Sequence, residues 1–412
     1  MGSIANWFRS AGFCVIAAAA ACGSAPKPVA AEAPAAPLLA IGAPLHPQAS
    51  PTAEPAPPAT PVAVATLPAA TPVSAPSAGA SDATPSAVGT ETLAGAHVLG
   101  RLDHEIFQIA THGSQLFLHH ATGNDSFKET GVAVSTVPSD GGTLRRISRD
   151  DVFESIGRLF PTDAGLFYTV GEGFAVGRDA VWKMPLPGGA PTHVATCAGC
   201  ALATNRTHLF WTSNDHSEST TGAQLPAKIM RTPLAGGAVE TLSVLSTQTG
   251  LFHSFQVVDD QLYYTGVGSN DDDRKAVFSL SANGGTPRKV LVLPKRTFIK
   301  NLVVRGKELY VQTVMGELFA YPIAGGTARV VVGPNASCGA RMWIPFELST
   351  THVYWADEGK LQRCALHGGK PELLFTSKAP IPSLKVTDGG VLFAAASETT
   401  PGQHLLLKLD LH

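Results

Sequence analysis

A pair of adjacent glycines recurs six times along the chain, each time after a short apolar run. The first glycines of the pairs are Gly141, Gly188, Gly236, Gly284, Gly325 and Gly368, so the spacings are 47, 48, 48, 41 and 43 residues. Self-similarity at a period of about 20–50 residues is typical of solenoids, propellers and other repeat folds. The repeat therefore constrains the fold more strongly than any other feature of the sequence.

A second repeated element lies upstream of each glycine pair. It reads Gln115-Leu-Phe-Leu-His119, Gly165-Leu-Phe-Tyr-Thr169, His208-Leu-Phe-Trp-Thr212, Gln261-Leu-Tyr-Tyr-Thr265, Glu308-Leu-Tyr-Val-Gln312 and His352-Val-Tyr-Trp-Ala356, and a seventh copy is Gly390-Val-Leu-Phe-Ala394. Short aromatic and β-branched runs bounded by turn residues predict strands. The lack of a 3.6-residue apolar period excludes a helical solenoid.

The fifth unit shows how one repeat divides into strands. Leu302–Arg305, Leu309–Thr313, Leu318–Pro322 and Ala328–Val332 are four strand candidates, with Gly325-Gly326 before the last. Glycine tolerates positive φ, which a tight hairpin turn requires. Four short antiparallel strands in 40–48 residues are typical of a β-propeller blade, so the sequence predicts an all-β propeller.

Seven blades are expected, with six as the alternative if the first unit folds irregularly. The last unit supplies three strands only, because the chain ends at His412. The segment 92–100 resembles an isolated fourth strand and lies just before the first unit. Pairing it with the last unit would close the ring and remove the open sheet edges. The expected domains are a signal peptide at 1–22, a tether at 23–91 and the propeller at 92–412.

The sixth unit carries a resemblance to a known group of proteins. It contains Val353-Tyr-Trp-Ala-Asp357, Leu366-His-Gly-Gly369 and Pro371-Glu-Leu-Leu374. These motifs resemble those of exported bacterial β-propeller proteins, including lipoproteins, and notably those of the myxobacterial type. They are also similar to the YWTD propellers of lipoprotein receptors and to tricorn-like sensor propellers. The resemblance covers residues 92–412 and implies the fold; its motifs are structural and imply no activity.

Composition separates the repeat from what precedes it. Of the 31 prolines, 15 lie between Cys22 and Leu93, in a stretch with few charges and few large apolar side chains. Such a segment does not bury enough surface to offset its ordering entropy, so residues 23–91 are predicted to be a disordered Pro/Ala-rich linker. The net charge of −2 and the pI of about 6.7 argue against a nucleic-acid partner.

The first 22 residues are typical of an export signal. Ala11–Ala21 forms an apolar run that is too short for a membrane-spanning helix and fits a signal-peptide core. Ala19-Ala-Ala-Cys22 resembles a lipobox, although Ala19 stands where leucine is usual. The expected location is the periplasm or outer membrane, with the membrane contacted only through a lipid on Cys22. Cleavage by the ordinary signal peptidase is the alternative.

The remaining cysteines of the exported part number four, which favours disulfides in an oxidising compartment. Cys197 and Cys200 are expected to form a local bridge, and Cys338 would then pair with Cys364. A four-cysteine zinc site is the rival, but the second pair lacks the usual spacing.

Five residues near the starts of the innermost strands are candidates for lining a central channel: Arg158, His253, Lys300, Arg341 and Trp343. Basic and imidazole groups in such a ring would suit an anionic ligand, and a water-filled polar channel is the alternative. No catalytic triad or paired-carboxylate spacing is present, so no catalytic residue and no cofactor are predicted.

Acidic loops are the weaker candidates for metal binding. Asp125, Asp215, Asp271, Asp272 and Asp273 lie in the long loops of the first, third and fourth units. Carboxylate oxygens are Ca²⁺ ligands, yet no loop reads as an EF-hand and these residues are common in solvated loops. No metal site is therefore predicted.

Two functions remain open from the sequence. The favoured one is a non-enzymatic, surface-tethered or periplasmic monomer that binds a protein or carbohydrate ligand through its loop face. The alternative is a periplasmic lyase or hydrolase with its site in the central channel. An enzyme predicts acid and base groups that converge within hydrogen-bond reach.

Overall fold

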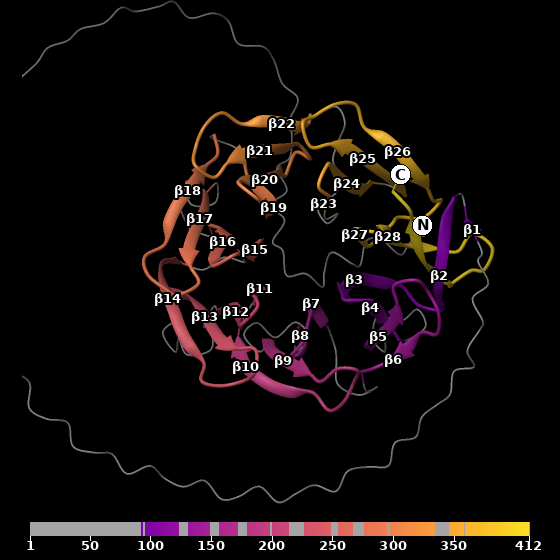
Figure 1. The fold of residues 1–412 in the computed structure, drawn as a ribbon, viewed down its shortest axis with the longest axis horizontal. Coiled ribbons are helices and arrows are strands. Elements are labelled where there is room, and N and C mark those ends of the chain that lie inside the picture. Colours follow the sequence, from indigo (N-terminus) through magenta and orange to yellow (C-terminus); the bar gives the residue numbers. More distant parts are fainter. Residues whose placement is uncertain are drawn as a thin grey trace, which may run out of the picture. The chain divides into compact units, whose positions relative to one another are not determined.

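The computed structural model describes residues 92–93, 95–122, 131–148, 156–171, 179–197, 200–213, 226–248, 254–266, 276–294, 297–333, 346–357 and 359–411. These residues form seven antiparallel sheets arranged as the blades of a ring (Figure 1). The predicted seven-bladed β-propeller with four-stranded blades is confirmed, and the six-bladed alternative is wrong. No helix in the described ranges is long and apolar enough to span a membrane.

Within each blade the strands follow one another from the channel outward, and we call them a, b, c and d. Blade 1 consists of β3 (Ile106–His112), β4 (Gln115–Ala121), β5 (Val132–Pro138) and β6 (Arg145–Arg146), and blade 2 of β7 (Ile156–Thr162), β8 (Gly165–Val170), β9 (Asp179–Met184) and β10 (Thr192–Cys197). Blade 3 consists of β11 (Leu202–Thr204), β12 (His208–Ser213), β13 (Pro226–Pro233) and β14 (Glu240–Gln248), and blade 4 of β15 (Phe255–Val258), β16 (Gln261–Thr265), β17 (Ala276–Ser281) and β18 (Arg288–Val292).

The remaining blades repeat this order. Blade 5 consists of β19 (Ile299–Arg305), β20 (Glu308–Thr313), β21 (Leu318–Pro322) and β22 (Arg329–Val332), and blade 6 of β23 (Phe346–Leu348), β24 (His352–Asp357), β25 (Lys360–Ala365) and β26 (Glu372–Thr376). Blade 7 takes β27 (Leu384–Thr387), β28 (Gly390–Ala396) and β29 (His404–Leu409) from one end of the repeat, and β2 (Ala96–Leu102) from the other.

The ring closes by pairing β2 with β29. Val98 lies opposite Leu407, and Leu102 lies opposite His404. The segment predicted as a lone strand at 92–100 thus forms β2 together with β1 (Thr92–Leu93), which adds a fifth strand outside β2. Closure matters because an unpaired β29 would be an open edge in the middle of a blade.

The core lies between neighbouring blades. Successive residues of a strand point to opposite faces, so each blade packs on both neighbours. Tyr354 joins the apolar cluster shared with blade 7, whereas the next residue, Trp355, joins the cluster shared with blade 5. Tyr263 and Tyr264 divide in the same way between blades 5 and 3. The repeated aromatic motif therefore supplies inter-blade packing, as the sequence predicts.

The Gly-Gly motif fixes the c–d turn against two other elements. Gly236 and Gly237 have φ of 97° and 147°, where an L side chain would be strained. Leu234, two residues before Gly236, donates its N–H to the Thr207 carbonyl in the a–b turn of the same blade (2.9 Å). The Leu234 carbonyl accepts a hydrogen bond from Lys183 Nζ of the preceding blade (2.8 Å). The turn thereby ties strand to strand and blade to blade.

The same inter-blade hydrogen bond recurs at two further junctions. Arg231 donates to the Ala282 carbonyl of blade 4 (2.8 Å), and Arg329 donates to the Leu366 carbonyl of blade 6. Both acceptors occupy the position equivalent to Leu234. The glycine repeat therefore marks the turns at which neighbouring blades are hydrogen-bonded. Because this role is structural, the spacing of the repeat gives no information on function.

Candidate functional site

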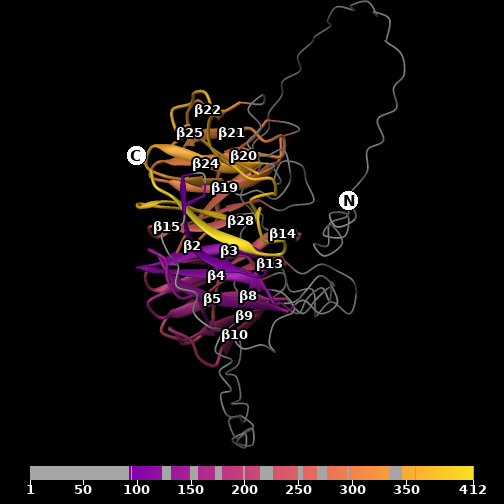
Figure 2. The same cartoon turned by 90° about the vertical axis from the view of Figure 1, so that its right-hand side faces the viewer.

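The two faces of the ring are built differently, as the strand bounds show (Figure 2). On one face, which we call the turn face, every a–b connection has two or three residues and every c–d turn has six or seven. On the other, the loop face, the b–c and d–a connections range from two residues at 358–359 to twelve at 214–225 and thirteen at 333–345. Length variation confined to one face is where a repeat protein acquires individual binding surfaces.

The central channel holds a cavity of about 310 Å³. Its lining comes from the a strands of four consecutive blades: Gln256, Val303, Val304, Arg305, Glu347, Leu348 and Lys385. Gln256, Val303, Glu347 and Lys385 occupy the same register position in β15, β19, β23 and β27, opposite the second residue after the start of each b strand. The cavity is therefore lined by one repeated position to which blades 4, 6 and 7 assign polar side chains.

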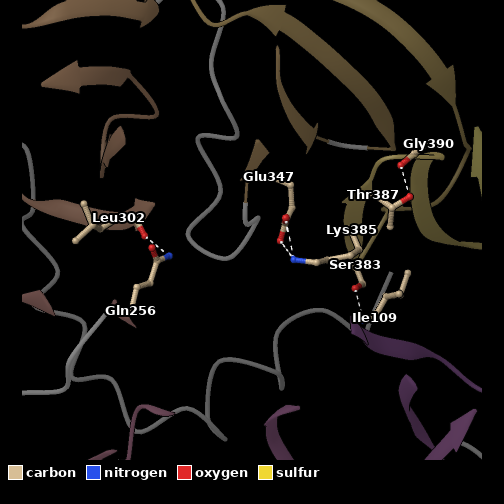
Figure 3. Close-up of polar contacts among 8 residues, drawn as sticks. All are labelled: Ile109, Gln256, Leu302, Glu347, Ser383, Lys385, Thr387 and Gly390. Carbon is tan, nitrogen blue, oxygen red and sulfur yellow. Dashed lines mark hydrogen bonds and ion pairs between the residues drawn. The ribbon is translucent and has the colours of Figure 1, made fainter. Parts of the chain in front are cut away.

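Gln256 forms a fixed wall of this cavity. Its Nε2 donates to the Leu302 carbonyl (2.9 Å), and its Oε1 accepts from the Val304 N–H (2.9 Å). The Gln256 amide therefore pairs with one carbonyl and one N–H on the inner edge of β19, as the backbone of a neighbouring strand would. Ser383 does the same between blades 7 and 1, where its hydroxyl accepts from the Ile109 N–H (3.1 Å). Figure 3 shows the contact of Gln256 with Leu302 and that of Ser383 with Ile109.

An ion pair lies across the junction of blades 6 and 7. Lys385 Nζ is 3.1 and 3.2 Å from the two carboxylate oxygens of Glu347 (Figure 3). Their side chains are 33% and 27% exposed, so water competes less for these charges than at an open surface. Both oxygens of the carboxylate accept from the same ammonium group.

Arg158 lies in β7 on blade 2, within electrostatic range of Glu347. Because protein surrounds the channel, the pKa of the Arg158 guanidinium is below its ordinary value, and the Glu347 carboxylate opposes this shift. The side chain itself remains exposed to channel solvent. Glu347 therefore interacts electrostatically with cations from two blades, Lys385 by contact and Arg158 at longer range.

The other predicted channel residues fall into two groups. Lys300 is the second residue of β19 and is half-buried, and it is not among the residues that line the cavity. His253, Arg341 and Trp343 lie outside the described residues. Of the five candidates, only Arg158 has a described interaction with a cavity-lining residue, its electrostatic interaction with Glu347, and neither Arg158 nor Lys300 lines the cavity.

Glu347, Lys385, Gln256 and Arg305 were missed by sequence reasoning. The expectation concerned basic, imidazole and tryptophan side chains at the starts of the inner strands. Gln256, Glu347 and Lys385 are each the second residue of such a strand and were not chosen, and Arg305 is the last residue of β19. The repeats did contain a signal. When they are aligned on the b-strand motif, the residue two or three places before the a–b turn is apolar in four blades: Ala110, Phe160, Ala203 and Val303. The polar replacements in the other three blades stand out against that background.

The cysteine predictions have different outcomes. The structure joins Cys197 and Cys200 in a disulfide with a Cα–Cα distance of 5.9 Å. The structure describes Cys364 as a free, buried thiol. Its predicted partner, Cys338, is not among the described residues, so the bridge between them stays a prediction. The Cys364 thiol lies 3.6 Å from the Val331 carbonyl and 3.5 Å from the Gly369 carbonyl. Cys22 also lies outside the described residues.

The acidic loop residues also lie outside the described residues: Asp125, Asp215, Asp271, Asp272 and Asp273. Among the residues that the structure does describe, no three histidine, cysteine, aspartate or glutamate side chains are placed to hold a metal ion. The cavity lining includes one carboxylate, and it is engaged by Lys385.

No protein-family model matches the chain, and no curated protein matches it in sequence. Solved structures do match. A chain of the nidogen/laminin complex has a TM-score of 0.44 and 14% identity, covering 65% of this chain and 97% of that one. The computationally designed Ika8 protein has a TM-score of 0.48 and 11% identity, covering 76% of this chain and 98% of that one.

A third solved structure, the CNH domain of AfRom2, has a TM-score of 0.52 and 10% identity. It covers 80% of this chain and all of its own length, 100%. At this identity the likeness establishes the shared fold alone. Function must therefore be argued from the faces and the channel of this chain.

Proposed function

We propose that the chain is a non-enzymatic β-propeller that binds a protein or a carbohydrate ligand through its loop face. The observation that carries this proposal is the contrast between the two faces. Uniform a–b and c–d turns occupy the turn face, and all the long connections belong to the loop face. Binding residues are disproportionately found on loops that a rigid scaffold positions.

The channel charges support a binding role over a catalytic one. A general base needs a carboxylate or imidazole that is free to take a proton from a substrate. The carboxylate of Glu347 instead accepts from Lys385 with both oxygens, and its second neighbour, Arg158, is also cationic.

The proposed setting is the periplasm or the outer membrane. Cleavage before Cys22 and acylation of its thiol would anchor the chain, and residues 23–91 would act as a tether. A flexible chain of about 70 residues has a root-mean-square span of roughly 45 Å, and its prolines make it stiffer. The propeller would then reach ligands beyond the membrane surface, as a monomer.

A binding screen with matched variants tests the proposed function. Residues 92–412 are applied to a glycan array and to an extracellular protein panel, and each hit is titrated. The loop-face variant Asp271→Ser/Asp272→Ser/Asp273→Ser removes three charges from the blade 4 b–c loop. The turn-face control Asp163→Ser/Asp260→Ser/Asp388→Ser removes three charges from a–b turns. The proposal predicts that affinity falls at least about tenfold in the first variant, or in a second variant with 214–225 replaced, and not in the control.

The anchor has a separate test. Metabolic labelling with palmitate should tag the wild-type precursor, and the variant Cys22→Ser should lose the label. Processing that continues in the presence of globomycin would contradict lipidation, because that inhibitor blocks the lipoprotein signal peptidase. The outcome bears on location only and leaves the binding proposal untouched.

A further inference from the structure

Two cationic side chains and one carboxylate line the cavity in the central channel. Arg305 and Lys385 line it with Glu347, whereas Arg158 of blade 2 is not a lining residue and interacts electrostatically with Glu347 at longer range. Glu347 neutralises one of the two lining cations, so the lining carries an excess of one positive charge. Among the described residues, neither Arg158 nor Arg305 has a hydrogen-bonded partner or an ion pair, whereas Lys385 has Glu347.

Unpaired guanidinium groups inside a channel have a chemical consequence. An arginine side chain offers five N–H donors in a planar fork, and carboxylates and phosphates match that fork with two acceptors. Fixed positive charges in a concave, protein-walled site also attract anions more strongly than the same charges on an open surface. The channel therefore offers donors that the described protein leaves unused.

We propose that this cavity is a binding site for a small organic anion with a carboxylate or phosphate group. Arg305 binds the anionic group, Lys385 is shared between the ligand and Glu347, and Arg158 adds positive charge at longer range. Val303 and Leu348 contribute apolar wall for a short carbon skeleton. The volume of about 310 Å³ lies at the lower end of small-molecule sites, which excludes a folded partner or a long glycan chain.

Glu347 is the internal counterion of this site. In the unliganded protein it satisfies Lys385 and partly offsets the charge of Arg158. An incoming anion must compete with this carboxylate, so Glu347 weakens binding while it keeps the empty channel stable. This arrangement distinguishes a ligand site from a purely structural ion pair, because the two predict opposite effects of neutralising Glu347.

The site is distinct from the loop face proposed above. Arg305 is the last residue of β19, next to the a–b turn at 306–307, and the cavity-lining residues lie within or at the ends of the a strands. A small anion in the channel therefore needs none of the long loops. Success or failure of the loop-face variants leaves this inference standing, and the reverse also holds.

Calorimetric titration of residues 92–412 tests the proposal. Inorganic phosphate and succinate are titrated separately, and chloride at matched ionic strength is the reference. Saturable binding of at least one anion is expected, and the stronger one identifies the recognised group. Arg305→Gln should weaken binding about tenfold or more. Glu347→Gln should strengthen it several-fold. The control Arg206→Gln removes the same charge from an exposed a–b turn and should change affinity less than about twofold.

Three results would overturn the proposal. They are an absence of saturable binding of either anion up to about 10 mM, equal weakening by Arg206→Gln and Arg305→Gln, and weaker binding in Glu347→Gln. The first would show that there is no anion site, the second that only the net charge of the protein matters, and the third that Glu347 contacts the ligand rather than competing with it. If Arg305→Gln proves unfolded by thermal melting, Lys385→Gln takes its place and should also weaken binding.

Discussion

Lys385 and Glu347 join the innermost strands of blades 6 and 7, with the lysine Nζ 3.1 and 3.2 Å from the two carboxylate oxygens. Each of these strands has a free edge toward the channel, so side chains rather than backbone link the blades there. The equivalent link between blades 4 and 5 is the Gln256 amide on the backbone of β19. The polar channel wall is thus part of what holds the ring together.

The ion pair should contribute modestly to stability. Lys385→Met leaves Glu347 without its contact partner and should lower the free energy of unfolding by about 1 kcal/mol, discounted for partial exposure. The exposed Lys360→Met should change it by less than about 0.5 kcal/mol. Urea unfolding of both variants measures the difference, and equal effects would show that the pair is energetically silent.

Ring closure should depend on β2. Val98, Leu99 and Leu102 are buried, and each contributes about 1.5–3 kcal/mol on burial. A fragment of residues 103–412 should therefore lose cooperative unfolding or self-associate through the open edge of β29. A fragment of residues 95–412, which lacks only β1, should behave like 92–412 in size-exclusion chromatography and thermal melting. A monomeric, cooperatively folded 103–412 fragment would contradict the closure.

His119 should make the protein sensitive to acid. Burial, and to a lesser degree the neighbouring His120, lowers the pKa of His119 from 6.5 to about 3. Below about pH 6.5 the histidine is protonated in the unfolded chain but stays neutral in the native state. The stability that the neutral His119 contributes is therefore complete above pH 6.5 and is lost as the pH falls toward 3. The loss should reach about 2 kcal/mol at pH 5.

Variants isolate the contribution of that histidine. His119→Gln should flatten the difference in unfolding free energy between pH 7 and pH 5 by about 2 kcal/mol. The exposed His367→Gln should leave the difference unchanged. Urea titrations at the two pH values measure both, and an unchanged pH profile in His119→Gln would show that His119 titrates normally in the native state.

Alkylation should distinguish the two kinds of cysteine. Burial raises the pKa of the Cys364 thiol, so iodoacetamide should not modify it in the native protein. Without reductant, unfolding in guanidinium chloride should expose Cys364 to modification, whereas Cys197 and Cys200 should react only after reduction. Mass spectrometry of the digested protein reads out each site. A Cys364 that reacts only after reduction would contradict the free thiol and support the predicted bridge to Cys338.

The fold was predictable because one local pattern repeats. Each copy of the aromatic motif and of the glycine pair reports the same two strands and the same turn, so errors in one unit are corrected by the others. The pairing of 92–100 with the last unit follows from a missing strand at one end and an extra strand at the other. This pairing can be predicted by counting strands, without knowing any long-range contact in advance.

The channel was less predictable because its residues break the repeat instead of forming it. Glu347 and Lys385 lie 38 residues apart in sequence and form an ion pair across a blade junction. Nothing in either local segment indicates that partner. The surroundings of Cys364 were also not predictable from its own segment. This third-strand residue lies in the packed interface with the preceding blade, among Trp355 and Leu318.

Hydrogen–deuterium exchange with the strongest hit of the binding screen tests the central claim, that ligands bind the loop face. The account predicts that bound ligand slows exchange in peptides from the b–c and d–a connections, such as 214–225 and 333–345. Peptides covering the c–d turns at 234–239 and 323–328 should exchange as in the free protein. Protection confined to those turns, with the loops unchanged, would contradict the account.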